Sequence, residues 1–338
     1  MLGRTNYDAG PLVYTPKKGP NATKKNGEKK KRGLTLALDA LVVLLVAGAT
    51  FAMFKLTNVK PENTEKNNPT VVTAPVEEED DEEETREITL QSVINSWFSS
   101  FSRETEKGIV IYDLENERVV GNLDENEQFD TASLYKLFVV YEGYQRVELG
   151  EWKETDESYG GMTVGDCLDK AIRESHSGCA ENLLARIGEQ KLDEIIRSQY
   201  GLENTSVERL VTTASDMAKF MTRVYKHKEL SEASYAKLAD SMLNQPKTES
   251  EDCEGGVCDW RMGVPAGFSE TAKVYNKVGW GWNGIYWTPW NDVMIVEYPQ
   301  YNRHFVIAFL SRKFPTVDRI REFGSLVDEA LAAYLELE

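Results

Sequence analysis

The chain is poor in the residue types that bind metals and nucleic acids. Among its 338 residues there are only 3 histidines and 4 cysteines. No two cysteines are spaced as C-x-x-C and no two histidines stand at ligand spacing, so a zinc site is the less favoured role for the cysteines. We expect no cofactor and no metal. Lys and Arg number 39 against 56 Asp and Glu, and a net charge of −17 argues against a nucleic-acid surface.

Long hydrophobic runs are also scarce, and the longest lies near the N-terminus. Residues 34–54 are almost wholly apolar apart from Asp39, and they are about long enough to cross a bilayer at roughly 1.5 Å per residue. Nine Lys or Arg against two acids precede this run within residues 1–32. Positive charge before the span predicts a basic cytoplasmic tail at 1–32, a transmembrane helix at 33–55 and an extracytoplasmic remainder.

A cleaved signal peptide is the alternative interpretation of this segment, with Ala47-Gly48-Ala49 as a candidate cleavage site. The length of the run and its long basic preface favour an uncleaved anchor. We therefore expect a single-pass protein of the cell membrane. Residues 56–92 follow as an acidic, disordered linker, in which eight consecutive acids at 77–84 repel one another and keep the chain extended.

All four cysteines lie beyond the predicted span, where an oxidising compartment favours disulfides. Four cysteines allow three pairings, and the sequence alone does not choose among them. The short intervening loops favour Cys167 with Cys179 and Cys253 with Cys258.

The hydrophobic patterns of residues 93–338 predict one α+β domain. Two strands, a block of helices, further strands and a last helix indicate an antiparallel sheet flanked by terminal helices, beside a helical lobe. The predicted strands are 108–112, 118–120, 272–278, 284–287, 292–298 and 304–311. The predicted helices are 133–149, 163–174, 180–187, 190–199, 213–226, 231–243 and 319–337.

The start of the first long helix carries a candidate nucleophile and base. Ser133 follows a polar run that ends at Asp130, and Lys136 lies three residues later on the same helical face. Burial in this apolar helix would lower the pKa of Lys136, so that a neutral amine could take the hydroxyl proton of Ser133. The backbone N–H groups at the helix start could stabilise an oxyanion. This pair indicates chemistry on acyl bonds.

An S-x-x-K string is weak evidence by itself. A second one, from Ser234 to Lys237, lies in the middle of a polar helix, where two solvated surface residues are the expected interpretation. On the string and its helix alone, a purely structural role for Ser133 is an equal alternative.

Two later segments strengthen the catalytic interpretation. Residues 175–177 read Ser-His-Ser and residues 277–279 read Lys-Val-Gly. Together with Ser133 and Lys136, and in this order, they resemble the S-x-x-K, S-D-N and K-T-G signatures of the serine β-lactamase and penicillin-binding superfamily, particularly its class A type. The resemblance covers roughly residues 95–335.

The resemblance implies a role for each matched residue. Ser133 would attack a carbonyl and form an acyl-enzyme, with Lys136 as the activating base. Ser175 would relay a proton to the leaving nitrogen, and Lys277 would hold the substrate carboxylate and lower neighbouring pKa values. The backbone N–H groups of Ser133 and Trp280 would form the oxyanion hole. The implied substrate-binding residues are Ser177, Val278, Gly279 and Trp280.

Three departures from the family pattern bear on turnover. Ser177 cannot offer the amide of the usual Asn, and Val278 has no hydroxyl to share a carboxylate with the neighbouring Lys. No E-x-x-L-N string occurs between Gly188 and Thr212, although class A enzymes use its Glu to activate the deacylating water. The resemblance therefore implies that a β-lactam adduct on Ser133 should persist.

Two functions are compatible with these motifs. The first is a membrane-anchored serine acyl hydrolase of the β-lactamase or D,D-peptidase type, acting on β-lactams or on peptide stems of the cell wall. The second is a catalytically weak penicillin- or peptidoglycan-binding or sensor module, which the residues at 177 and 278 keep open.

Two neighbouring features have simpler interpretations. His176 is expected to be a solvated turn residue, because Lys136 already supplies a base. An aromatic run could line a glycan cleft or pack around a strand pair, and packing is at least as good an interpretation. Its members are Trp280, Trp282, Tyr286, Trp287 and Trp290.

Overall fold

A computed structural model describes residues 89–337, apart from the segments 101–105, 250–256, 283–286 and 313–315. The predicted cytoplasmic tail, the transmembrane helix and nearly all of the predicted linker lie outside the described residues. Within the described ranges, no helix combines the length and the apolar character that crossing a bilayer requires.

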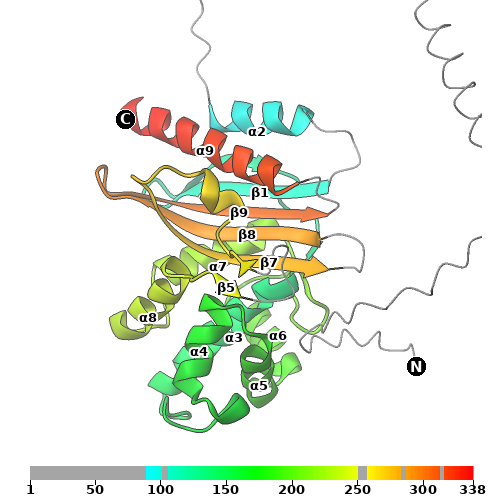
Figure 1. The fold of residues 1–338 in the computed structure, drawn as a ribbon, viewed down its shortest axis with the longest axis vertical. Helices are drawn as coiled ribbons and strands as arrows, with labels where there is room; N and C mark the ends of the chain where they lie inside the picture. The colour runs from blue at the N-terminus through cyan, green and yellow to red at the C-terminus, as the bar shows by residue number, and fades with distance from the viewer. Residues whose placement is uncertain (1–88, 101–105, 250–256, 283–286, 313–315, 338) are drawn as a thin grey trace, which may run out of the picture. The chain divides into compact units, whose positions relative to one another are not determined.

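A five-stranded antiparallel sheet forms the middle layer (Figure 1). Its strand order is β2-β1-β9-β8-β7, so the N-terminal hairpin joins the C-terminal strands through the β1–β9 pair. Both faces are buried, because Val293 and Ile295 of β8 face one hydrophobic cluster while Met294 and Val296 face the other. The strands are β1 (Glu106–Asp113), β2 (Arg118–Leu123), β7 (Lys273–Trp282), β8 (Trp287–Tyr298) and β9 (Arg303–Arg312).

The predicted hairpin and the strands near 272–278, 292–298 and 304–311 are confirmed, and each is longer than its apolar run suggested. Of the separate strand expected at 284–287, only Trp287 is described, and it opens β8.

The two terminal helices cover one face of the sheet. α2 (Leu90–Ser99) and α9 (Val317–Leu337) pack on each other, and the Trp97 ring lies 4.8 Å from the Phe323 ring. Thr89 caps α2 by accepting a hydrogen bond from the Ser92 backbone N–H. α2 therefore begins slightly ahead of the domain boundary expected at residue 93.

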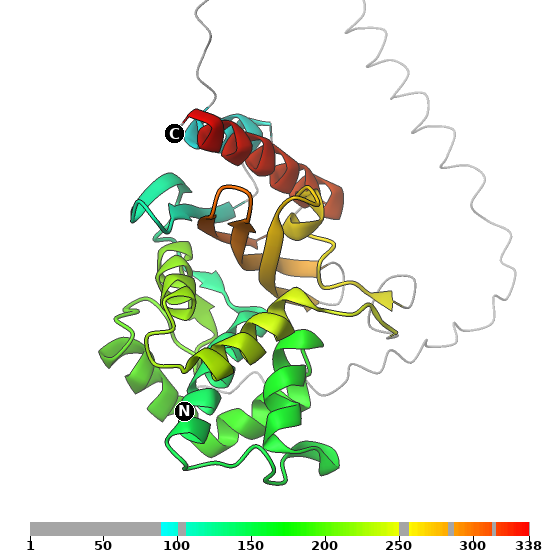
Figure 2. The same ribbon diagram turned by 90° about the vertical axis from the view of Figure 1, so that its left-hand side faces the viewer.

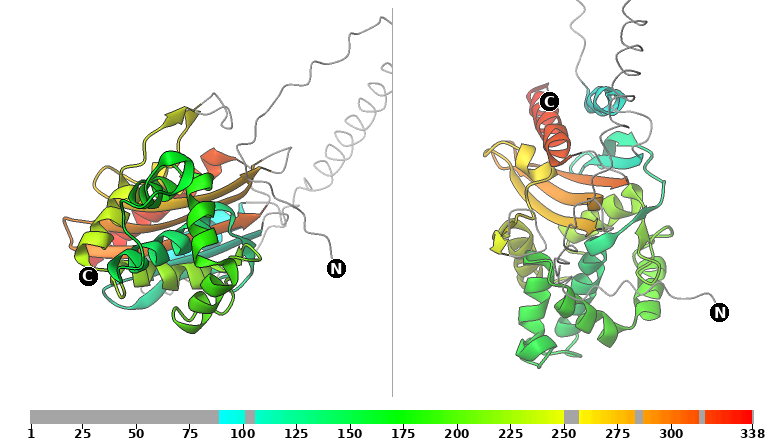
Figure 3. Two further views of the ribbon diagram at one scale, coloured as in Figure 1. Left: turned by 90° about the horizontal axis from the view of Figure 1, so that it is seen from below. Right: turned by 45° about the vertical axis from the view of Figure 1, so that its right-hand side comes forward.

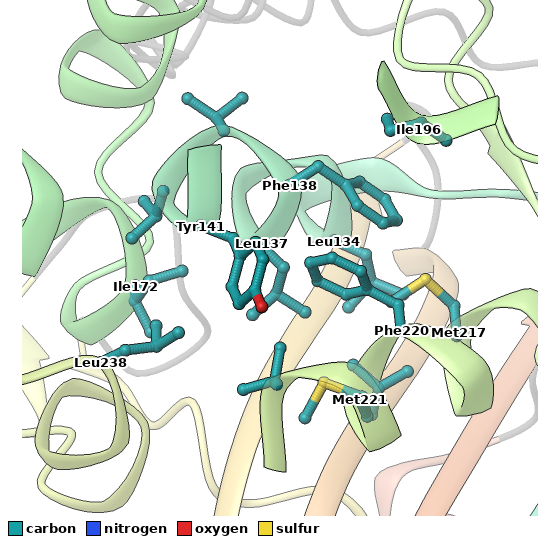
Figure 4. Packing of buried hydrophobic residues seen from close by; sticks show 14 of the residues in the cluster. Leu134, Leu137, Phe138, Tyr141, Ile172, Ile196, Met217, Phe220, Met221 and Leu238 are labelled. Atoms are coloured by element: carbon teal, nitrogen blue, oxygen red, sulfur yellow. The ribbon is translucent and has the colours of Figure 1, made fainter. Parts of the chain in front are cut away.

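A helical lobe covers the opposite face, as the views in Figures 2 and 3 agree. Its core is built around Phe138 of the first lobe helix and Phe220, whose rings lie 4.4 Å apart beside Tyr141 and Leu137 (Figure 4). All six predicted lobe helices are confirmed. They are α3 (Tyr135–Glu148), α4 (Val164–Arg173), α5 (Ser177–Ile187), α6 (Glu189–Ser198), α7 (Ala214–Tyr225) and α8 (Glu232–Leu243).

The first lobe helix differs at its start from the expected helix at 133–149. A 3₁₀ turn, η1 (Ala132–Leu134), precedes α3, because the chain turns through a positive φ of 40° at Ala132 before helical geometry begins. Several elements too short for a periodic signal were not predicted. They are η2 (Tyr159–Gly161), η4 (Val264–Gly267), the β3–β4 pair (Phe129–Asp130 and Val211–Thr212) and the β5–β6 pair (Thr248–Glu249 and Val257–Cys258).

One disulfide joins α4 to α5. Cys167 and Cys179 are bonded with their Cα atoms 4.8 Å apart, which confirms the first predicted pairing. Cys258 is buried and is not a free thiol. Its predicted partner Cys253 lies outside the described residues, so the second pairing stays a prediction.

Removing the α4–α5 disulfide should lower stability. The bond closes a loop of 12 residues, and such a loop is worth about 2–3 kcal/mol through the entropy of the unfolded chain. We expect a Cys167→Ala/Cys179→Ala variant to lose about this much unfolding free energy in guanidinium titrations. Reduced wild-type protein should lose at least this amount, because reduction breaks this bond and the disulfide of Cys258 as well. Unchanged stability in both samples would contradict the prediction.

Candidate active site

Ser133 stands in the η1 turn at a strained point of the backbone. Ala132 has a positive φ, and its N–H donates a 2.8 Å hydrogen bond to Asp130 Oδ1. The Leu134 N–H donates to the Thr131 carbonyl and closes the turn. The Ser133 side chain is half-buried, and within the described part of the chain its hydroxyl has no hydrogen-bond partner. The turn therefore presents a hydroxyl that is free to react.

Lys136 lies in the first turn of α3 with only 1% of its surface exposed. Its Nζ donates to Ser177 Oγ at 3.0 Å, to Ser175 Oγ at 3.3 Å and to the Ser175 carbonyl. Burial lowers the pKa of Lys136 to about 7, against a smaller opposing effect of the Glu181 carboxylate. This amine can therefore be neutral near pH 7. No hydrogen bond joins it to Ser133 among the described contacts, which is common before substrate binds.

The turn between α4 and α5 carries the second motif. Ser175 has a φ of 55°, outside the usual range for a residue with a Cβ, and this conformation aims its carbonyl and hydroxyl at Lys136. The Cys167–Cys179 disulfide spans the turn. His176 is not the solvated residue expected, because it is half-buried and its Nδ1 accepts a hydrogen bond from the Cys179 N–H as the N-cap of α5.

Lys277 reaches the same turn from the edge strand β7. Its Nζ donates to Ser175 Oγ at 2.9 Å and to the Val278 carbonyl at 2.7 Å, and 1% of its surface is exposed. Burial holds the pKa of Lys277 well below its usual value, the positive charge of Lys136 lowers it further, and the carboxyl of Asp292 opposes both. The Ser175 hydroxyl thus lies between two buried amines.

Gly279 allows β7 to approach the turn that holds Ser133. A Cβ placed at Gly279 would lie 2.4 Å from the Thr131 carbonyl oxygen and 2.7 Å from Leu134 Cγ. From the next strand, Asn291 Nδ2 donates a 2.7 Å hydrogen bond to the Asp130 carbonyl. The structure therefore brings the predicted residues of all three motifs together.

Two residues expected to bind substrate have side chains elsewhere. Val278 is 1% exposed and packs in the cluster under α9, so its side chain contributes to the core and only its main chain faces the site. Trp280 is 9% exposed and lies 4.5 Å from Trp290, ring to ring. For these two aromatics, packing rather than a glycan cleft is the observed role. The side chains of Trp282, Tyr286 and Trp287 lie outside the described residues.

The second S-x-x-K string has a structural role. Lys237 is half-exposed and forms an ion pair with Glu154. Ser234 is buried rather than solvated, and its N–H donates to the N-cap hydroxyl of Ser231. Both residues of this second string therefore make contacts that stabilise the fold.

A clamp that the sequence did not predict ties the α4–α5 turn to α8 and β7. Arg173, two residues before Ser175, donates to Asp240 Oδ2 at 2.6 Å and to the Asn244 carbonyl at 2.7 Å. The next residue, Gln245, donates a 2.7 Å hydrogen bond to the Asn276 carbonyl beside Lys277. These partners lie far apart in the sequence, so no local pattern signals the contact.

A second unpredicted feature is a buried carboxyl behind β7. Asp292 accepts a hydrogen bond from Asn276 Nδ2 at 3.0 Å, on the sheet face away from Ser175. Burial raises the pKa of Asp292 to about 8. Among the described residues, no group of three or more His, Cys, Asp or Glu side chains is arranged to hold a metal ion.

The segment between α6 and α7 carries two carboxylates. Glu203 and Glu208 are exposed. Asp216 of α7 is buried and accepts hydrogen bonds from the Asn204 N–H at 2.8 Å and from Thr205 Oγ1 at 3.0 Å. Asp193 of α6 is also buried and accepts 2.6 Å hydrogen bonds from Ser206 Oγ and from the Val207 N–H. Its acceptor positions are used to fix this segment.

The comparisons with known proteins agree with this geometry. A model of the β-lactamase enzyme family matches residues 89–331. The chain belongs to this family. It is therefore a serine hydrolase of the β-lactamase type. No curated protein sequence matches the chain.

Solved structures share the fold at low sequence identity. PBP-A is 17% identical, with a TM-score of 0.60 over 73% of this chain and 98% of PBP-A. A PBP-A mutant solved as an acyl-enzyme complex with penicillin G is 18% identical, with a TM-score of 0.61 over the same shares. A β-lactamase from Xanthomonas campestris is 17% identical, with a TM-score of 0.61 over 71% of this chain and 98% of that enzyme.

The Gly279→Ala variant should be less stable and slower to react. Its new methyl group would collide with the Thr131 carbonyl, so β7 and η1 must move apart. We expect a loss of about 1–3 kcal/mol in unfolding free energy together with slower acylation by a fluorescent penicillin. Gly165→Ala is the control, because a Cβ there meets no atom closer than 3.3 Å. Wild-type stability and acylation in the Gly279 variant would contradict the close packing described here.

The buried amine of Lys136 should make stability depend on pH. The unfolded chain binds this proton up to about pH 10, whereas the folded protein releases it above about pH 7. The unfolding free energy should therefore rise with pH between about 7 and 10, by up to about 1.4 kcal/mol per pH unit.

The Lys136→Met variant should show a smaller slope in denaturant titrations across this window. Lys237→Met removes a lysine that is 51% exposed and should keep the wild-type slope. Equal slopes in all three proteins would show that Lys136 is not held as a buried amine.

Proposed function

We propose that the chain is a membrane-anchored, extracytoplasmic serine acyl hydrolase of the β-lactamase or D,D-peptidase type. Its Ser133 would be acylated by β-lactams or by peptides of the cell wall, and the acyl-enzyme would be hydrolysed slowly. The observation that carries this proposal is the convergence of two buried lysines on the Ser175 hydroxyl. One of these lysines, Lys136, lies in the first turn of the helix that directly follows the η1 turn of Ser133.

Acylation uses these groups in a defined order. The neutral amine of Lys136 takes the proton of Ser133 Oγ as that oxygen attacks the carbonyl carbon of the substrate. The backbone N–H groups of Ser133 and Trp280 stabilise the oxyanion that forms. The C–N bond then breaks, and the leaving nitrogen takes a proton from Ser175 Oγ, which Lys136 replenishes across the 3.3 Å contact. Lys277 supplies positive charge for a substrate carboxylate.

Slow deacylation is expected because no carboxylate between Gly188 and Thr212 is available as a base for the attacking water. Water attack on the ester needs a base near the bond, and class A enzymes use a Glu from this segment. The four glutamates of this range are all exposed, namely Glu189, Glu194, Glu203 and Glu208. Its aspartate, Asp193, is occupied by two hydrogen bonds. The acyl-enzyme is therefore expected to outlive the encounter with the drug.

The membrane anchor and the location rest on the sequence. The apolar run at 34–54 follows nine basic residues, a pattern that places the later chain outside the cytoplasm. The disulfide between Cys167 and Cys179 fits this, because such bonds persist in oxidising compartments.

A second candidate is a penicillin- or peptidoglycan-binding sensor with little turnover. Ser177 replaces the usual Asn, and its hydroxyl accepts a hydrogen bond from Lys136. The side chain of Val278 is buried in the core. Both changes remove side-chain contacts that would hold a substrate for repeated reaction. In this case binding of the ligand, without acylation of Ser133, would itself be the signal.

A labelled penicillin should form a long-lived adduct on Ser133. We expect intact-protein mass spectrometry to show one added drug mass that remains for many minutes after free drug is removed, and peptide mapping to place it on Ser133. Ser133→Ala should abolish the adduct because it removes the nucleophile. Ser234→Ala, in the second S-x-x-K string, should keep it.

Two results would argue against the proposal. An adduct on another residue would remove Ser133 from its role, and rapid hydrolysis of the drug at high turnover would contradict slow deacylation. Cells that carry Ser133→Ala distinguish the two candidates. Loss of the wild-type phenotype would show that the function requires acylation of Ser133, and an unchanged phenotype would favour the sensor.

A further inference from the structure

Glu181 lies one helical turn beyond a residue that touches the catalytic amine. Ser177 is the first residue of α5, and its Oγ accepts a 3.0 Å hydrogen bond from Lys136 Nζ. Residues four apart on a helix share a face, with Cβ atoms about 5–6 Å apart. Glu181 is therefore the next side chain along the face that meets Lys136.

The rest of α5 fixes this orientation. Its other face is buried in the lobe core, where Ala180 and Leu183 pack and where α5 meets α3. Glu181 is exposed. Glu181 therefore lies at the surface of α5, one helical turn from the Ser177 hydroxyl that contacts Lys136.

The titratable groups around Lys136 come from four elements, and the Tyr135 ring lies 6.0 Å from Lys136 Nζ. β7 contributes the amine of Lys277, the turn before α5 contributes His176, α3 contributes the phenol of Tyr135, and α5 contributes Glu181. Burial is the main cause of the lowered pKa of Lys136, and the Glu181 carboxylate acts in the opposite direction. Glu181 likewise adds to the effect of burial in raising the pKa of Tyr135. Two neighbouring groups of α3 therefore both experience this carboxylate.

We propose that Glu181 is a positioning residue that acts through Lys136. Its negative charge favours the protonated form of the amine, and so sets the lowest pH at which Lys136 can accept the Ser133 proton. This role rests on the proposed function, in which Lys136 is the base for acylation. Glu181 is not part of the family signatures. It holds the working range of the site near neutral pH.

Loss of the Glu181 charge should change the reaction rate in the direction opposite to that caused by structural damage. Without the negative charge, Lys136 loses its proton more easily, so more of it is neutral in acid. A Glu181→Gln variant should therefore react faster than wild type at low pH and equally fast at high pH. A mutation that merely disturbs the fold slows the reaction at every pH.

The test measures Lys136 and the reaction separately in the full-length protein. Lysine labelled with ¹³C at Cε is titrated by NMR, and the Lys136 signal is assigned by its absence in Lys136→Ala. In Glu181→Gln the midpoint should move to lower pH by about 0.3 to 0.5. Acylation by a fluorescent penicillin should be about two- to threefold faster than wild type at pH 5.5 and unchanged at pH 8.5.

Glu189→Gln is the matched control. Glu189 begins α6 and acts on Tyr135, but it is not among the charges that act on Lys136. This variant should keep the wild-type midpoint and acylation profile. An equal change in both variants would reduce the effect to overall charge and overturn the specific role of Glu181.

The remaining outcomes separate the two proposals. An unmoved Lys136 midpoint in Glu181→Gln overturns the role of Glu181, whether or not the protein is acylated. A midpoint that moves in a wild-type background that never reacts with penicillin supports the coupling of Glu181 to Lys136 and refutes the proposed function instead.

Discussion

The site depends on one hydroxyl shared by two buried amines. Ser175 Oγ lies 3.3 Å from Lys136 Nζ and 2.9 Å from Lys277 Nζ, and neither lysine has more than 1% of its surface in contact with solvent. Two cations this close and this dry are unfavourable together, so a proton on one amine disfavours a proton on the other. The hydroxyl between them can donate to one side while it accepts from the other. The hydrogen-bond link between the two amines is therefore a property of the arrangement, and no single residue provides it.

The most constrained turns of the fold hold this arrangement in place. The turn at Ser175 has a positive φ and is spanned by the α4–α5 disulfide. The turn at Ser133 follows another positive φ and lies against the bare backbone of Gly279. Such conformations cost free energy and persist where the surrounding structure enforces them. Here both occur on the walls of the same cleft, which is the pattern expected of a site that must be rigid before substrate arrives.

Sequence reasoning found most of the fold and the outline of the site for physical reasons. The lobe helices and central strands are long and periodic, so their burial pattern is visible in the chain. The candidate site residues were found because S-x-x-K stands in a known order with two other motifs. Sequence reasoning could not show that the Val278 side chain points into the core, because the face of the sheet on which a side chain lies depends on the register of the strand. It also missed Arg173, whose partners lie some 70 residues away, and the 3₁₀ turn at Ala132, which is too short for a periodic signal.

The Arg173 clamp closes a ring of contacts between the α4–α5 turn and β7. On one side the ring runs from Ser175 to Lys277 through a hydrogen bond, and on the other it returns from Arg173 through residues 244–245 to Asn276. A closed ring has no free hinge, so its two walls cannot part on one side without straining the bonds on the other. The position of Ser175 relative to Lys277 is therefore fixed from two sides, by the direct hydrogen bond and by the Arg173 clamp.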